Sequence, residues 1–265
     1  MNKNSIMSFT DVGSGFPVLL GHSYLFDSTM WSPQIALLSE GFRVIVPDLW
    51  GHGHSPTLPS SVMSLTDLAY DFLALMDHLG IHEFAVVGLS VGGMWGAELA
   101  ALAPDRVKSL MLFDTYLGEE TTEAKDNYFS MLNAVAAAGV IPPSLVKYMI
   151  SQFYSEFSSG KDRTELETHL SSLTAENLRE SIVPLGKLIF GRPDRMSVLD
   201  RITCPVFVAT GELDQPRPVS EGQAMADRLK CDFSVIPHAG HISNREQPQF
   251  VTDLINSFLK VSVKR

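Results

Sequence analysis

Short apolar runs alternate along the chain with longer segments of helical periodicity. The helical pattern is clearest over residues 65–79, where apolar side chains recur every three or four positions and Gly80 follows as a stop. Ser64 and Thr66 offer caps at its start. This alternation is typical of a parallel sheet with crossover helices. The strand candidates are residues 17–21, 43–47, 84–88, 109–113, 205–210 and 233–236.

Residues 116–190 interrupt the alternation, because they contain helical patterns and no convincing strand. Breaks near residues 139–143 and 158–160 divide the segment into several helices. One crossover needs only one helix, so the segment predicts a cap over the strand ends, where open α/β sheets bind ligands. We expect an α/β fold with a mostly parallel central sheet and helices on both faces. Its core would comprise residues 1–115 and 191–265, with 116–190 as the cap.

Composition narrows the possible partners. The 265-residue chain is 45% hydrophobic, which is enough for one well-packed domain with an insertion. Its net charge is −10 and its only basic cluster is Lys264-Arg265, so we expect no nucleic-acid partner. The two cysteines, Cys204 and Cys231, lack metal-ligand spacing and fit a reducing compartment as small core residues.

No membrane or export segment is predicted. The first 15 residues contain no apolar stretch of signal-peptide length, so we expect a cytoplasmic protein. The most apolar long window, residues 84–103, is broken by glycines and carries Glu98, which indicates a strand, a turn and a helix. Composition leaves a monomer and a homodimer equally open.

The sequence GLSVG at residues 88–92 lies between an apolar strand pattern and a helical pattern. This is the G-x-S-x-G nucleophile elbow in its required strand-to-helix setting. A serine on such a sharp turn has a strained backbone, and side chains two residues before or after it would collide, which explains Gly88 and Gly92. Ser90 is therefore the candidate nucleophile.

A serine hydroxyl needs a base and an orienting carboxylate to become reactive. Of the eight histidines, His241 is favoured, because its loop follows the last strand at the edge that holds the elbow. His238 in the same loop is expected to brace it. Asp214, just after strand 205–210, is the favoured acid. Glu212 is less favoured, and Asp114 is a rival because its strand ends at the same edge.

Over nearly its whole length the chain resembles the α/β-hydrolase superfamily. The resemblance rests on VLLGHSYLFDSTMW at 18–31, VIVPDLWGHGHS at 44–55, the elbow segment 86–114, and the loops around Asp214 and His241. It implies Ser90, Asp214 and His241 as nucleophile, acid and base. It also implies an oxyanion hole formed by the backbone amides of Val91 and Tyr24.

The chain departs from the family pattern at one position of the first loop. Many relatives have His-Gly where this chain has His22-Ser23, so a hydroxyl is added beside the expected pocket. A polar residue followed by serine here, with MWSPQ at 30–34 and HISNREQP at 241–248, is similar to the 3-oxoadipate enol-lactonases. Ser23, Leu89 and Tyr116 are expected to line the substrate pocket.

No phosphate loop, nucleotide fingerprint or metal-ligand spacing is present, so the mechanism expected is cofactor-free acyl transfer to Ser90 and then to water. The expected substrate is a small ester or lactone, and the lack of a basic cluster argues against a strongly anionic one. Carbon–carbon bond hydrolysis, perhydrolysis and lyase chemistry on the same triad stay open. So does a ligand-binding signalling protein that keeps the triad with little turnover.

Overall fold

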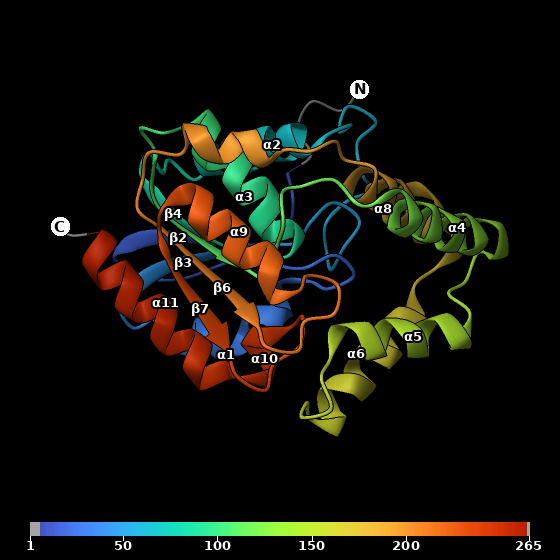
Figure 1. Ribbon diagram of the computed structural model, residues 1–265. Coiled ribbons are helices and arrows are strands. Elements are labelled where there is room, and N and C mark those ends of the chain that lie inside the picture. The colour runs from blue at the N-terminus through green and yellow to red at the C-terminus, as the bar shows by residue number, and fades with distance from the viewer. Residues whose placement is uncertain (1–5, 264–265) are drawn as a thin grey trace.

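The computed structural model describes residues 6–263, and within that range seven strands form one sheet in the order β1-β3-β2-β4-β5-β6-β7 (Figure 1). Neighbouring strands are parallel except β1 and β3. The predicted fold class is therefore confirmed. The strands are β1 (Phe9–Gly13), β2 (Phe16–Gly21), β3 (Phe42–Pro47), β4 (Phe84–Leu89), β5 (Val107–Phe113), β6 (Val206–Gly211) and β7 (Asp232–Ile236).

All six predicted strands are present, with ends shifted by a residue or two, but the sequence pattern missed β1. This strand lies at the edge of the sheet and pairs only with β3. Its residues are half-buried or exposed, so it has no continuous apolar run. An edge strand that needs little burial leaves a weak signal in the sequence.

Helices cover both faces of the sheet (Figure 1). One face carries α1 (Ser32–Leu38) and α11 (Pro248–Ser262), and the other carries α2 (Leu65–His78), α3 (Val91–Leu102) and α9 (Val219–Leu229). The predicted helix 65–79 is α2, and the Ser64 hydroxyl caps it by accepting the Asp67 amide at 3.1 Å. Three short helical segments complete this body: η1 (Ser28–Trp31), η3 (Met196–Arg201) and α10 (Ser243–Glu246).

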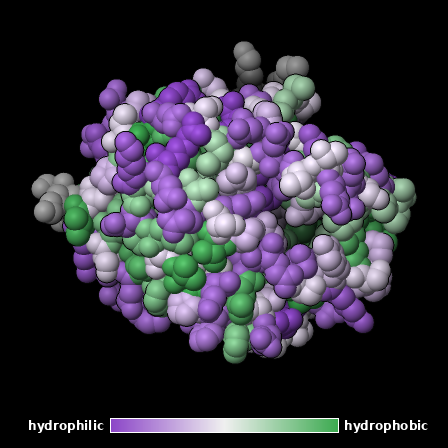
Figure 2. Space-filling model, in the orientation of Figure 1, coloured by the Kyte–Doolittle hydropathy of each residue, from purple (hydrophilic) through white to green (hydrophobic). Residues whose placement is uncertain are grey.

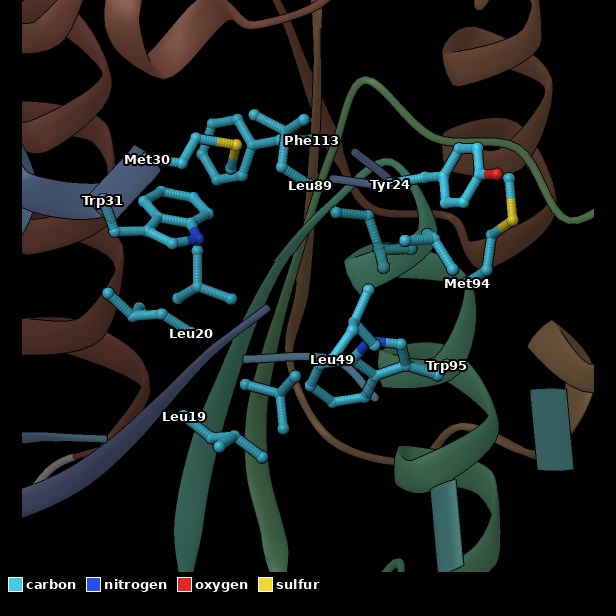
Figure 3. Close-up of a cluster of buried hydrophobic side chains, with 14 of the residues drawn as sticks. Leu19, Leu20, Tyr24, Met30, Trp31, Leu49, Leu89, Met94, Trp95 and Phe113 are labelled. Atoms are coloured by element: carbon cyan, nitrogen blue, oxygen red, sulfur yellow. The ribbon is translucent and has the colours of Figure 1, made fainter. Parts of the chain in front are cut away.

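The core lies between the sheet and these helices (Figure 3). Trp95 of α3 is fully buried and stacks on Phe72 of α2, with ring centroids 3.7 Å apart. Figure 3 shows Leu89 beside Phe113 in this packed region, while Tyr24 and Met94 lie together on its other side. The residues that follow β2 and β4 thus pack directly on the hydrophobic core.

Residues 116–190 form helices and contain no strand, as the periodicity predicts. In Figure 1 these helices lie together to one side of the sheet. They are α4 (Thr122–Ala138), α5 (Pro143–Phe153), α6 (Gly160–Ser172), α7 (Ala175–Asn177), the π-helical turn η2 (Leu178–Ile182) and α8 (Val183–Phe190). We call this set the cap helices. Across residues 6–263, no helix is both long enough and apolar enough to cross a bilayer.

Candidate active site

Ser90 lies on the turn between β4 and α3, with φ 58° and ψ −121°. Residues other than glycine rarely adopt this backbone conformation. The tight turn is possible only because nearby positions lack side chains. A Cβ at Gly92 would lie 2.2 Å from the Gly21 carbonyl oxygen, and one at Gly88 would lie 2.2 Å from the Gly92 carbonyl oxygen. The glycines of the motif are thus required by close backbone approach.

Strand β5 and the residue pair after it hold the turn in place. The Ser90 amide donates to the Phe113 carbonyl at 2.9 Å, and the Thr115 hydroxyl donates to the Ser90 carbonyl at 2.6 Å. Thr115 is buried, so this bond is protected from water. Thr115 was given no role from the sequence, although it lies only two residues after a core strand.

Ser90, His241 and Asp214 form one hydrogen-bonded chain. His241 Nε2 is 2.9 Å from Ser90 Oγ, and His241 Nδ1 is 2.9 Å from Asp214 Oδ2. All three residues are buried, and each comes from a different loop at the same edge of the sheet. With Nδ1 donating to the carboxylate, Nε2 is free to accept the serine proton.

The imidazole of His241 is held in its neutral form. Burial lowers the pKa of His241 to about 4, against the opposing influence of the Asp114 carboxylate, which raises it. A neutral imidazole is the form that accepts a proton from a serine hydroxyl. At neutral pH, Nε2 of His241 is therefore available to accept a proton.

The Asp214 loop is closed by its own backbone, because the Arg217 amide donates to Asp214 Oδ1 at 2.9 Å. Glu212, the less favoured acid, is half-exposed and instead accepts the backbone amide of His238 at 2.9 Å. The His238 ring points to solvent with 62% of its side chain exposed. The His238 ring also packs against Phe157, with ring centroids 4.8 Å apart, and its backbone amide braces the loop by donating to Glu212.

Asp114, the rival acid, contacts two loops and makes no hydrogen bond to His241. Its carboxylate accepts the Gly211 amide at 2.7 Å and the Ser243 hydroxyl. Burial raises the pKa of Asp114 well above its ordinary value, and the nearby Asp214 carboxylate raises it further. This carboxyl group ties the end of β6 to the segment after His241.

The amides of Tyr24 and Val91 lie on the two turns expected to form an oxyanion hole. Among the hydrogen bonds of residues 6–263, neither amide donates to a protein acceptor. Such free amides at the end of β2 and the start of α3 are available to a ligand oxygen.

Two buried histidines hold the Tyr24 loop. His22 Nδ1 donates to the Ser23 carbonyl at 2.8 Å, while its Nε2 accepts the Leu49 amide at 2.8 Å. His52 Nε2 accepts the Leu25 amide at 3.2 Å. Burial lowers the pKa of both rings, that of His52 to about 3, so both stay neutral and keep these bonds. Neither histidine could be given a role from the sequence, because their partners are backbone groups.

A cavity that is partly open to solvent lies over Ser90 between the cap helices and the sheet. Figure 2 shows the surface hollowed between these two parts of the molecule. The cavity is lined by Ser23, as expected, and by apolar side chains of the cap helices, among them Met131, Leu132, Met149 and Phe153.

Two of the residues expected to line the pocket lie elsewhere. Leu89 is fully buried in the core, because side chains alternate along β4 and its own turns toward Phe113 (Figure 3). Tyr116 packs against the edge of the core beside Gly118, and its carbonyl accepts Arg192 Nη2 at 3.1 Å. Neither belongs to the cavity wall.

Arg217, which was not predicted from the sequence, lines the same cavity as His241. Its position three residues after Asp214 was a usable signal. No group of three or more His, Cys, Asp or Glu side chains in the described part of the chain is arranged to hold a metal ion.

Comparison with known proteins finds relatives similar in sequence and fold. The curated 3-oxoadipate enol-lactonase 2 of Acinetobacter baylyi is 27% identical over 232 residues, covering 88% of this chain and 84% of that protein. A thermophilic esterase from Thermogutta terrifontis superposes with a TM-score of 0.85 at 34% identity, covering 96% of this chain and 93% of that one. An enol-lactonase from Burkholderia xenovorans shares the fold, with a TM-score of 0.84 at 24% identity and 96% coverage of both chains.

A family model described as the alpha/beta hydrolase fold matches residues 17–248. That span includes the sheet from β2 to β7, the elbow, and the loops of Asp214 and His241. The chain therefore belongs to the α/β-hydrolase family.

Proposed function

We propose that this protein is a serine hydrolase that cleaves a small carboxylic ester or lactone through an acyl-enzyme on Ser90. The observation that carries the proposal is the unbroken hydrogen-bond chain from Ser90 Oγ through His241 to Asp214, at 2.9 Å on each side of the imidazole. The relatives named enol-lactonase and esterase support the proposal that the bond cleaved is an ester bond.

Each step follows from the contacts described. Ser90 Oγ attacks the carbonyl carbon while His241 Nε2 takes its proton, and the carbonyl oxygen becomes an oxyanion facing the amides of Tyr24 and Val91. The intermediate collapses, and His241 returns the proton to the departing alkoxide. Water then attacks the acyl-enzyme by the same route and releases the acid and free Ser90. In a lactone, the departing alkoxide stays tethered to the acyl group.

Asp214 supports this sequence by orienting the imidazole and stabilising its positive charge during each proton transfer. The cavity contributes apolar walls that hold the acyl or alkoxy part of the substrate and keep bulk water from the oxyanion.

Stopped-flow mixing with an activated aryl acetate tests the proposal. We expect a burst of phenol of one equivalent per active site, followed by turnover, and neither phase in Ser90→Ala. Mass spectrometry of the quenched burst should place the acetyl group on Ser90. If the wild-type protein fails to acylate with excess ester, the hydrolase proposal is wrong and a binding protein with an idle triad is favoured.

A further inference from the structure

Among the described residues that line the cavity, only Arg217 has a permanently charged side chain. The other polar lining groups besides Ser90 and His241 are uncharged hydroxyls and one amide, from Ser23, Tyr24, Tyr128, Tyr148 and Gln152. The charge state of the cavity, and hence the charge of the ligand that it accepts, depends on what neutralises Arg217.

Two carboxylates already neutralise Arg217. Its Nη2 contacts the Glu120 carboxylate, and its Nη1 is 3.3 Å from Glu221 Oε2. Glu120 also pairs with Arg192 Nη1 at 2.7 Å. The side chains of both arginines and Glu120 are 7% exposed or less, so these three charges are almost closed to water, while Glu221 is partly exposed at the edge of the cluster.

The surrounding groups keep the Arg217 guanidinium charged, and both of its terminal nitrogens are already paired with carboxylates. Burial alone lowers the pKa of Arg217, and the Glu120 and Glu221 carboxylates more than offset this, so its pKa is raised. An ion pair this deeply buried is held because each charge has a partner. A ligand carboxylate would therefore find no unpaired cation among the described residues of the cavity wall.

An anionic ligand would lose its hydration on entering this apolar cavity, and the neutral cluster would return little of that energy. An uncharged ligand has no such cost and gains from the apolar wall. We propose that the site selects uncharged esters or lactones, and that Glu120 and Glu221 determine this specificity by cancelling the charge of Arg217. The inference rests on the proposed function for the site, but concerns the charge of the ligand.

Ligand binding to the Ser90→Ala protein tests the inference without turnover. The probes are ethyl succinamate, which is uncharged, and monoethyl succinate, which has nearly the same shape and is an anion at about pH 7.5. By calorimetry, we expect the amide to bind at least about tenfold more tightly than the anion. An anion that binds as tightly as the amide, or better, overturns the inference. So does a protein that binds neither probe.

The role of the carboxylates is tested in the same background with Glu221→Gln, which preserves size and frees part of the Arg217 charge. Glu221 is 27% exposed, so the substitution should be tolerated better than one at Glu120. We expect the ratio of the Kd of the anion to the Kd of the amide to fall by about fivefold in this variant.

Glu83→Gln is the matched control, because it makes the same change in net charge at a surface pair with Lys108. It should leave the preference unchanged. An unchanged preference in folded Glu221→Gln, or an equal shift in the control, overturns the assigned role of the carboxylates.

The two proposals fail separately. Wild-type protein that binds the amide selectively but never acylates with the aryl acetate would refute hydrolysis and support charge selection. Wild-type protein that acylates, while its Ser90→Ala form prefers the anion, would do the reverse.

Discussion

Asp114 and Asp214 are identical side chains in different hydrogen-bonding environments. Asp214 accepts from His241 and from the Arg217 amide, so its carboxylate faces the imidazole. Asp114 accepts from Gly211 and Ser243, so it connects two loops. At the residue scale, this difference in donors predicts that the two carboxylates have different roles in catalysis and stability.

Asp214→Asn should lower kcat by about a thousandfold or more, because an amide there favours the wrong imidazole tautomer and cannot stabilise its charge. Asp114→Asn should lower kcat much less and lower the free energy of unfolding by about 1–3 kcal/mol, because one buried donor loses a strong acceptor. Ester turnover and thermal unfolding measure the two effects. A larger loss of kcat in Asp114→Asn would mean that Asp214 is not the acid.

At the scale of elements, the π-helical turn η2 joins the cap helices to the loop that carries the Tyr24 amide. The buried Tyr24 hydroxyl donates to the Ile182 carbonyl at 2.7 Å. A Cβ at Gly186 would lie 2.6 Å from that hydroxyl, so glycine there leaves it room. The Ser181 hydroxyl also accepts the Leu58 amide at 3.1 Å. The position of the cap is thus linked to that of the candidate oxyanion hole.

Tyr24→Phe should lower the free energy of unfolding by about 1–3 kcal/mol, because it leaves the buried Ile182 carbonyl without its donor. It should also lower kcat by about tenfold with a smaller change in KM, because the Tyr24 amide is less well positioned. Chemical denaturation and steady-state kinetics measure the two effects. Tyr70→Phe on the exposed side of α2 is the control and should change neither. A normal kcat in Tyr24→Phe would show that the link does not position the amide.

At the scale of the whole molecule, the cap and the sheet together bury His241 and thereby set the pH range of the site. Removal from water disfavours the charged imidazole, which lowers the pKa of His241 to about 4 from an ordinary value of 6.5. The base is protonated only below its pKa. Activity should therefore be retained on acidification past pH 6.5.

For an uncharged ester, we expect kcat/KM to stay level from about pH 7.5 and to fall with an apparent pKa below 6.5. Samples returned to neutral pH should recover full activity, which separates titration of the site from acid unfolding. An acid limb centred at or above pH 6.5 would contradict the expected effect of burial on His241.

Much of the fold was predictable because its signals are local. Six strands and helix α2 were predictable from apolar runs and helical spacing. The elbow was predictable from glycines that the turn requires sterically. Edge strand β1 was not predicted, because its half-buried and exposed residues form no apolar run. Leu89 was placed in the pocket although the alternation along β4 turns it into the core.

By itself, the sequence determined six of the seven described strands and their alternation with helices, the serine elbow and the set of candidate acids and bases, since these depend on residues close together in the chain. Only the tertiary structure decided that Asp214 rather than Asp114 contacts His241, and that Glu120 lies against Arg217. Packing brings these residues together from distant segments, and no local pattern of side chains records which loops will meet.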